Sequence, residues 1–527
     1  MSNTAALNRR TLRNYLLLCG AGAHLLLVAG LLGVALLFPD HSLGQVLKKA
    51  QQRLSGNHPT IAGVIGGTLA VTGLGAQREI EHQQLPAFPG PSAWPGQGPR
   101  RAGFDWIGYD QHGVPQQAAA GRSINRSDHR IVDVGDTQAL LAALKKARPG
   151  DVITLSPGTY RIAKRRLGLG AGGLPGKPIY VTAAQFGDVE IQLDSLEGFF
   201  VDQPYWVFEN LKIRGVCSSD SRCEHAFHVV GRAIGTTLRN NEITDFNAAL
   251  KVNGLFGGKT PRFPDFGLVH NNAIYNTRAR RTANPVSLLN INAANGWVVS
   301  ANFIADFAKA TGNRVSYGAY MKSNSRDGVF ERNLVVCHWR VPPAGDTRVG
   351  LSFGGGGSDP RFCRDGSNRV EHSAGMIRNN IVARCPDVGI YLNKSAHTQV
   401  QHNLLSATRG IDVRFASSSA SIHNNVMDGR IRDRDGGLHN ADNNLVADQC
   451  GWLDRLLGDC GTGDWYEAPL GGGFRVVGID SLLGRGNTDP RGEPDFCGNP
   501  RAAPSDIGPI QYGAGPLCLP DIRSAVQ

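Results

Sequence analysis

The sequence NNAIY at residues 271–275 contains a short pattern, an asparagine followed by apolar residues, that recurs along the chain. It is found at Asn210-Leu-Lys-Ile, Asn241-Glu-Ile, Asn272-Ala-Ile, Asn302-Phe-Ile, Asn333-Leu-Val, Asn380-Ile-Val, Asn403-Leu-Leu, Asn425-Val-Met and Asn444-Leu-Val. The spacings between successive asparagines are 31, 31, 30, 31, 47, 23, 22 and 19 residues. Such a period indicates stacked repeats, each too short to bury its apolar side chains without its neighbours.

The apolar runs in these repeats are short and rich in Val, Ile and Leu, which predicts strands and excludes a helical solenoid. A leucine-rich horseshoe would need a denser leucine pattern. The sequence therefore predicts an all-β solenoid, a single-stranded parallel β-helix. We interpret the recurrent asparagine as structural, because it tolerates left-handed backbone geometry and can hydrogen-bond to the asparagine of the next coil.

The segment before the repeats, residues 136–162, reads DTQALLAALKKARPGDVITLSPGTYRI. The leucines between residues 140 and 144 have helical spacing, which predicts a helix that ends before Pro149-Gly150. Alternating apolar residues after this break predict two short strands.

Composition places the chain among globular proteins. It has 527 residues, 67 of them glycine, with 41% hydrophobic and 19% charged residues, unlike a disordered chain. The net charge is +11, of which +5 lies in residues 1–60. The residues after position 60 carry a mild net positive charge, which permits a polyanionic partner. No Lys/Arg-rich run with interleaved aromatic residues is present, which argues against nucleic acid as a partner.

Residues 15–38 are 24 residues without an Asp, Glu, Lys or Arg. As a helix rising about 1.5 Å per residue, this stretch is long enough to cross a bilayer, so we expect an uncleaved transmembrane anchor. The alternative is a cleaved signal peptide, whose apolar region is shorter. A second apolar stretch, residues 61–76, is short for a span. We interpret it as an interfacial or packed segment, with a second span as the alternative.

These segments divide the chain into five predicted parts. They are a basic cytoplasmic tail at 1–14, a transmembrane anchor at 15–38, a membrane-proximal segment with a Pro/Gly-rich linker at 39–130, a parallel β-helix domain at 131–515 and a C-terminal tail at 516–527.

The cysteines indicate the compartment. Nine of the ten lie outside the predicted anchor, and eight form close pairs in the sequence: Cys217/Cys223, Cys337/Cys363, Cys450/Cys460 and Cys497/Cys518. Cys385 has no obvious mate. Local disulfides are typical of oxidising compartments, whereas no pair has the C-x-x-C spacing of a zinc or redox site. The alternative is that the cysteines are unpaired core residues. We expect the main domain in a bacterial periplasm, anchored to the inner membrane by a single span.

With these features the sequence resembles the right-handed parallel β-helix superfamily of bacterial carbohydrate-active proteins. Residues 136–160 are similar to the N-terminal cap and first coil of those proteins, and residues 489–512, DPRGEPDFCGNPRAAPSDIGPIQY, to a tail found on many secreted members. The resemblance covers residues 132–512 and implies a right-handed β-helix with an N-terminal capping helix. The fold hosts lyases, hydrolases, epimerases and non-enzymes, so it leaves the activity open.

Candidate site residues come from aligning the coils. GAYMKSNS from Gly318, GIYLNKSA from Gly389 and GIDVRFAS from Gly410 align, and GLSFGGGG from Gly350 shares their start. Strand alternation places every second residue of these coils on the outer face. The outward residues form two columns, with Lys394 at the edge and two asparagines one coil earlier: Tyr320, Ser352, Tyr391, Asp412; Lys322, Gly354, Asn393, Arg414; Asn290, Asn292. This polar face suits an extended sugar chain.

The residues between Asn333 and Asn380 exceed one coil and must leave it as a loop, which is a usual place for a binding site. The alternative is a disulfide-tied insertion without a substrate. Glu371-His372 at its end, and Asp433 with Asp435 farther on, offer further titratable groups. For these we favour a core-satisfied histidine and a salt-bridged turn over catalytic roles.

β-Elimination of a uronate requires a group that neutralises its carboxylate, a base for the C5 proton and a donor for the leaving oxygen. Lys322, Arg414 and Arg348 with Tyr391 or Tyr320 supply these types of group. C5-epimerisation begins with the same deprotonation, so the set is compatible with either reaction.

The stretch MKSNSRDGVFERN at residues 321–333 resembles the strand with the catalytic lysine of the chondroitinase B and alginate lyase family. The resemblance implies Lys322 as the base. That family has acidic calcium ligands five and seven residues upstream of its lysine, where this chain has Tyr317 and Val315. We therefore predict no residue as a metal ligand. The sequence identifies no certain cofactor, and calcium stays a possible one.

Two hypotheses follow. The first is a membrane-anchored periplasmic enzyme, a lyase or an epimerase, that acts on an acidic polysaccharide. The second is a non-catalytic polysaccharide-binding or assembly protein of an exopolysaccharide export system, which the anchor and the missing calcium ligands favour.

Overall fold

The computed structural model describes the greater part of the predicted β-helix. It covers residues 106–109, 115–117, 129–257, 260–343, 345–355, 357–447, 465–466, 479–487 and 494–514. The predicted cytoplasmic tail, anchor, second apolar stretch and C-terminal tail lie outside the described residues. Among the residues described, no helix combines the length and the apolarity needed to cross a bilayer. Within the predicted linker, β1 (Trp106–Tyr109) and β2 (Pro115–Gln117) pair antiparallel.

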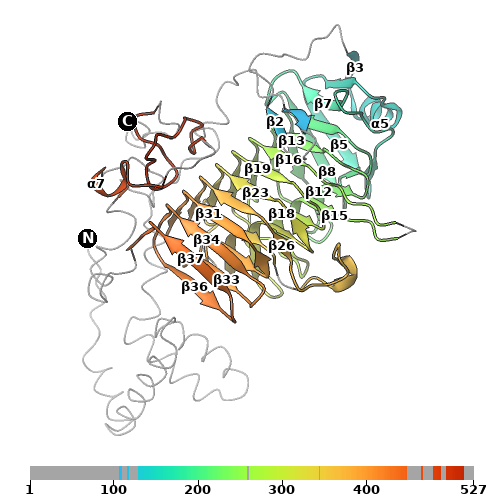
Figure 1. Ribbon diagram of the computed structural model, residues 1–527. Helices are drawn as coiled ribbons and strands as arrows, with labels where there is room; N and C mark the ends of the chain where they lie inside the picture. Colours follow the sequence, from blue (N-terminus) through green and yellow to red (C-terminus); the bar gives the residue numbers. More distant parts are fainter. Residues whose placement is uncertain are drawn as a thin grey trace, which may run out of the picture. The chain divides into compact units, whose positions relative to one another are not determined.

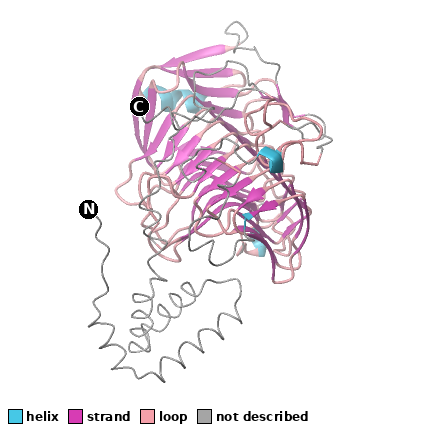
Figure 2. Ribbon diagram, turned by 90° about the vertical axis from the view of Figure 1, so that its left-hand side faces the viewer, coloured by secondary structure: helices cyan, strands magenta, loops and turns pink. Residues whose placement is uncertain are grey.

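Residues 129–447 form the predicted parallel β-helix (Figures 1 and 2), in which three long sheets follow the chain order coil by coil. The twelve-stranded sheet contains β3 (Arg130–Val134), β4 (Asp151–Leu155), β7 (Ile179–Ala183), β10 (Trp206–Glu209), β13 (Thr237–Arg239), β16 (Leu268–His270), β19 (Val298–Ser300), β23 (Val329–Glu331), β27 (Met376–Arg378), β31 (Thr398–Gln401), β34 (Ser419–His423) and β37 (Leu438–Asp442). The eleven-stranded sheet contains β5 (Gly158–Ala163), β8 (Val189–Asp194), β11 (Lys212–Gly215), β14 (Glu242–Thr244), β17 (Ala273–Tyr275), β20 (Phe303–Ala305), β24 (Leu334–Val336), β28 (Ile381–Ala383), β32 (Leu404–Ser406), β35 (Val426–Met427) and β38 (Leu445–Val446).

The ten-stranded sheet carries the predicted site. It contains β6 (Leu167–Gly168), β9 (Phe199–Val201), β12 (His225–Val230), β15 (Ala248–Asn253), β18 (Val286–Asn292), β21 (Val315–Lys322), β25 (Thr347–Phe353), β29 (Ile390–Asn393), β33 (Gly410–Arg414) and β36 (Arg430–Arg434). A small sheet contains β22 (Ser325–Arg326), β26 (His372–Ser373) and β30 (Ser395–Ala396). Short helical elements are the 3₁₀ turn Pro360–Phe362 and α7 (Ile479–Leu482).

The predicted helix before the repeats is confirmed as α5 (Thr137–Lys146) at one end of the stack (Figure 1). Asp136 caps its N-terminus by accepting the Ala139 N–H at 2.8 Å, which satisfies one of the unpaired donors of the first turn. Leu140 and Leu144 are buried against the first coil. The helix therefore covers the apolar end of the solenoid.

The interior of the stack is apolar because every second strand residue points inward. In the ten-stranded sheet, Leu289, Ala319, Leu351, Ile390 and Ile411 stand in register and are fully buried. The inward positions expected from coil alignment are thus confirmed for these strands.

The asparagine ladder is confirmed from Asn241 to Asn444. The Asn272 N–H and Nδ2 donate to Asn302 Oδ1 at 2.9 and 3.0 Å, and Nδ2 also donates to the Leu238 carbonyl. Each asparagine therefore ties its coil to both neighbours.

Two details of the predicted ladder were wrong. Leu211, and not Asn210, aligns with Asn241, because the Leu211 N–H donates to Asn241 Oδ1 at 3.1 Å. The left-handed residue is the one before the ladder position, with φ of 65° at Asn210, 56° at Asn240 and 53° at Asn271. The residue before the ladder position thus turns the chain, and the ladder residue itself bonds to the next coil.

The disulfides correct one predicted pairing. Cys217–Cys223 is confirmed, but Cys337 pairs with Cys385 at a Cα–Cα distance of 4.9 Å, and Cys363 is a buried free thiol. The reason is the register, since β24 and β28 stack directly and the two cysteines follow them. Cys450, Cys460 and Cys518 lie outside the described residues, so two predicted pairs remain predictions.

Part of the C-terminal region packs on the eleven-stranded sheet. Phe496, Ile507 and Ile510 belong to a second apolar cluster with outward-facing residues of that sheet, such as Leu404 and Val426. Asn379 and Arg501 bond the segment to the β-helix. From β17 to β35 this sheet is therefore apolar on both faces, whereas the ten-stranded sheet carries a polar outer face.

We expect Asn333→Ala to lower the free energy of unfolding by about 3 kcal/mol, because the buried N–H and Nδ2 of Asn302 would lose their acceptor. Urea unfolding of the full chain measures the change. Asn440→Ala, at an exposed position on β37, is the matched control and should change stability little. Equal effects of the two substitutions would contradict the structural role of the ladder.

Candidate functional site

The polar strip, defined here as two columns on the outer face of the ten-stranded sheet, contains most of the predicted site residues. Strand pairing places His228, Lys251, Asn290, Tyr320, Ser352, Tyr391 and Asp412 in one column. In the next column Asn292 pairs with Lys322, and Asn393 with Arg414. The predicted alignment of these residues is confirmed, while their catalytic and binding roles remain predictions.

Lys251 is the residue of this strip that sequence reasoning missed. Its Nζ donates to Asn290 Oδ1 at 3.0 Å, and Asn292 Nδ2 donates to the same oxygen at 2.6 Å. Burial, together with the positive charge of Lys322, lowers the pKa of Lys251 to about 7, while Glu224 acts in the opposite direction. A substantial fraction of Lys251 is therefore a neutral amine near neutral pH.

The signal for Lys251 was available in the sequence. Residues 248–253, AALKVN, alternate in the same way as residues 287–292, SLLNIN, and the register pairs Lys251 with Asn290.

Lys322 lies two strands beyond Lys251. Its Nζ is 5.0 Å from the centroid of the Tyr320 ring, and its stem lies beside Gly355. Burial lowers the pKa of Lys322, while the charge of Glu371 favours its protonated form. The site thus brings two lysines onto one face, and the charge of Lys322 acts on Lys251 through space.

Two histidines border Lys251 on β12. Burial lowers the pKa of His228 and lowers that of His225 to about 3, so neither carries a charge at neutral pH. His228 Nε2 is hydrogen bonded to Asn253 Oδ1 at 2.8 Å. The positive charge at this part of the strip therefore comes from lysine.

The far end of the strip is internally bonded. Tyr391 OH accepts hydrogen bonds from Asn393 Nδ2 at 2.9 Å and from Arg414 Nη1 at 3.1 Å, and Arg414 also pairs with Asp435. Asp412 is buried between Arg432 and Arg434. Tyr391 and Arg414 therefore lie together as predicted, but two strands or more from Lys322.

Other predicted residues have partners of their own. Lys394 Nζ donates to the Asn368 carbonyl at 2.9 Å, and its backbone is left-handed with φ of 55°. Asp433 is 2.7 Å from His439 Nδ1, which with the Arg414–Asp435 pair confirms the salt-bridged turn favoured for this region.

Arg348, predicted as a catalytic cation, is on β25 and is completely buried. Its guanidinium bonds to Asp346 and to the carbonyls of Cys337, Val341 and Pro342. These contacts lie inside the protein, so we assign Arg348 a structural role and leave it out of the proposed site.

The predicted insertion, residues 354–371, is anchored beneath the strip. Glu371 is fully buried and accepts the Ser323 N–H at 2.7 Å and the Ser358 hydroxyl at 2.8 Å. His372 is buried and stacked on Phe353 at 3.9 Å, and burial lowers its pKa to about 3. His372 is therefore a core residue, in which Nε2 accepts the Gly328 N–H at 3.3 Å while Nδ1 has no hydrogen-bond partner among the described residues.

This insertion meets a second one, residues 254–267, which follows β15. Arg364 pairs with Asp265 at 2.6 Å and lies over the Phe263 ring, and Phe256 contacts Phe362. Both insertions follow strands of the ten-stranded sheet, so they rise at the same edge of the strip.

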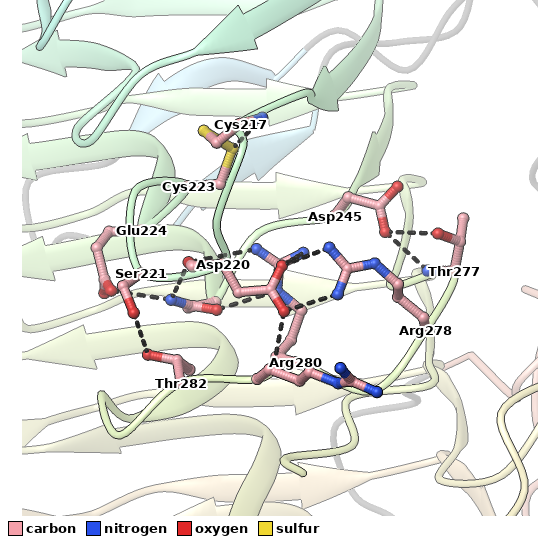
Figure 3. Close-up of polar contacts among 12 residues, drawn as sticks. Cys217, Asp220, Ser221, Cys223, Glu224, Asp245, Thr277, Arg278, Arg280 and Thr282 are labelled. Carbon is pink, nitrogen blue, oxygen red and sulfur yellow. Dashed lines mark hydrogen bonds and ion pairs between the residues drawn. A yellow bond between two sulfur atoms is a disulfide. The ribbon is translucent and has the colours of Figure 1, made fainter. Parts of the chain in front are cut away.

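An ion cluster lies near the opposite edge (Figure 3). The Asp220 carboxylate accepts hydrogen bonds from both terminal nitrogens of Arg278, at 2.7 and 2.6 Å. It also lies 3.1 Å from Arg280 Nη1 and accepts a hydrogen bond from the Arg281 backbone N–H. Burial alone would raise the pKa of Asp220, but these contacts hold it below its usual value. The cluster fixes the 217–223 loop against the coil that contains Arg280.

The residues present do not fit a calcium ion. Val315 and Tyr317, which stand where the resemblance places acidic ligands, offer no carboxylate. The carboxylates near Lys251 are already bonded, Asp220 to arginines and Glu224 to Asn247 and Asn284. Among the described residues, no three acidic, histidine or cysteine side chains converge as metal ligands would. We therefore derive no step through calcium.

No protein-family model and no curated protein matches the sequence. Similar solved structures include the pectate lyase Pel9A, which is 15% identical over 70% of this chain and 90% of that chain, with a TM-score of 0.46. A PL6 family polysaccharide lyase from Pseudopedobacter saltans is 13% identical over 62% and 94% of the two chains, with a TM-score of 0.32. An alginate lyase from Paenibacillus sp. str. FPU-7 is 12% identical over 60% and 96%, also with a TM-score of 0.32. Each of these three similar structures is a polysaccharide lyase.

Proposed function

We propose that this protein is a polysaccharide lyase that cleaves an acidic polysaccharide by β-elimination, with Lys251 as the base. The observation that carries the proposal is the pKa of Lys251, lowered to about 7 on a polar strip that also holds Lys322. A general base is most effective when its pKa lies near the working pH. An amine of ordinary pKa would be almost fully protonated there and unable to accept a proton.

The proposed reaction begins when the neutral Lys251 amine accepts the proton from C5 of a uronate. The Lys322 ammonium neutralises the sugar carboxylate, which stabilises the negative charge that develops at C5. The electron pair of the broken C–H bond forms the C4–C5 double bond as the C4–O bond breaks. The leaving oxygen takes its proton from the Lys251 ammonium on the same face. Asn290, Asn292 and Asn253 offer amide groups that orient the hydroxyls.

Epimerisation remains an outcome of the test. It needs the same C5 deprotonation, followed by proton return on the opposite face. The described residues of the strip place both lysines on one face of the sheet, which favours elimination.

We also propose that residues 15–38 anchor the protein in a bacterial inner membrane, with the β-helix in the periplasm. The Cys217–Cys223 and Cys337–Cys385 disulfides support this location, since such bonds persist in oxidising compartments.

Replacing Lys251 by Met should reduce cleavage of a susceptible polyuronate at least about a hundredfold, because the base is lost. Ultraviolet absorbance of the unsaturated product measures the rate. Lys177→Met, at an exposed turn, is the matched control and should retain activity. A flat trace for the unaltered protein across pectate, alginate and glucuronate polymers would contradict the lyase proposal, and hydrogen exchange at C5 would then identify an epimerase.

The pH dependence of kcat/KM should rise through about pH 7, because the deprotonated Lys251 is the reactive form, and should fall again at higher pH, where Lys322 loses its charge. Lys322→Met removes a positive charge that lowers the pKa of Lys251, so the midpoint should move to higher pH while the maximal rate falls. An unchanged midpoint in this variant would argue against coupling between the two amines.

Activity should be insensitive to chelation, because lysine supplies the charge that neutralises the carboxylate. Rates measured after extensive treatment with EDTA, and again after adding calcium, should agree with the untreated rate. A loss on chelation that calcium restores would show that a metal takes part.

A further inference from the structure

A cavity of about 420 Å³ lies beside the first strands of the ten-stranded sheet. Its lining is Ala163, Lys164, Arg165, Asp194, Leu196 and Arg222. A volume of this size is within the usual range for small-ligand sites. The cavity is separate from Lys251 and Lys322, so it is not part of the site described above.

The cavity is basic. Three lining residues are cationic and one is acidic, which gives the lining a net charge of +2. The side chains of Lys164 and Arg165 have no hydrogen-bond or ion-pair partner within the described part of the chain, and Arg222 is 3.7 Å from Asp194 while remaining 64% exposed. These cations are therefore available to an anionic ligand.

The position of Arg222 is fixed by its surroundings. It lies on the 217–223 loop that the Cys217–Cys223 disulfide closes, next to Asp220, which the arginine cluster holds (Figure 3). Ser221 Oγ is 3.3 Å from Thr282 Oγ1, which adds a further contact to the same loop. A loop constrained at both sides of Arg222 loses little entropy when that residue binds a ligand.

Residues at the cavity contact the first residues of the polar strip. The Leu196 carbonyl accepts the His225 N–H at 3.1 Å, and Glu197 lies between Arg166, at 3.5 Å, and His228, at 3.8 Å. Residues of the cavity precede β6, β9 and β12, and Lys251 is on the next strand of the sheet, β15. The middle of the cavity is thus about two strand spacings, roughly 10 Å, from the coil of Lys251.

We propose that this cavity binds an anionic group, a carboxylate or a sulfate, on the same acidic polysaccharide that Lys251 attacks. The proposal rests on the proposed function and extends it. A sugar unit in an extended chain advances by about one coil of the β-helix, so the bound unit lies about two units from the cleaved bond. The substrate is then a linear polyanion that runs along the stack toward α5. A dimer is too short to reach both places.

The test measures binding, so that it does not depend on turnover. The full chain carrying Lys251→Met is titrated with oligogalacturonates and oligoalginates of two and eight units. Adding Lys164→Gln and Arg222→Gln to this variant should weaken binding of the octamer roughly tenfold and leave the affinity for the dimer unchanged. The pair Lys177→Gln and Arg485→Gln removes the same charge at exposed positions away from the proposed path, just before β7 and after α7, and serves as the control.

The outcomes separate the two proposals. Equal octamer affinity in the two double variants would overturn the cavity proposal, even if the unaltered protein cleaves the polymer. A selective loss of octamer affinity in a protein without turnover would keep the cavity proposal and overturn the lyase. Absence of binding to every oligomer would overturn both. Reduction of the Cys217–Cys223 disulfide should also weaken octamer binding, because Arg222 would lose its fixed position.

Discussion

The stacking of one coil on the next through parallel-strand hydrogen bonds and the asparagine ladder determines where every side chain of the site lies. Each ladder asparagine holds its own coil and both neighbours, which keeps the register constant over eight coils. Because register is constant, residues far apart in the sequence, such as Lys251 and Asn290, stand side by side. The polar strip is a direct product of this constraint.

Constant register also concentrates charge. Alternation places Lys251 and Lys322 on the outer face within two strands of each other. Burial lowers the pKa of both lysines, and the charge of Lys322 lowers that of Lys251 further. The same alternation buries the apolar half of each strand, so the lysines stand on a rigid support. An amine with a lowered pKa and a nearby cation thus arise from the repeat itself, and the insertions after β15 and β25 rise at one edge of the strip.

Much of this arrangement could be predicted because, in a β-helix, residues one repeat apart in the sequence lie side by side on adjacent strands. The columns from Asn290 to Asp412 followed from aligning coils, and the helix Thr137–Lys146 from its leucine spacing. Features that depend on three-dimensional distance were missed. Cys337 pairs with Cys385 because their coils stack, although an insertion separates them in sequence. The lowered pKa of Lys251 depends on burial and on Lys322, which no local pattern reveals.

The apolar outer face of strands β17 to β35 in the eleven-stranded sheet has a consequence for biosynthesis. The residues that share its cluster, Phe496, Ile507 and Ile510, are made well after the coils on which they pack. During synthesis, a stack with paired strands would therefore expose an aggregation-prone surface until this late segment arrives. Efficient production of the folded protein then requires either fast delivery of that segment or a chaperone that shields the face in the meantime.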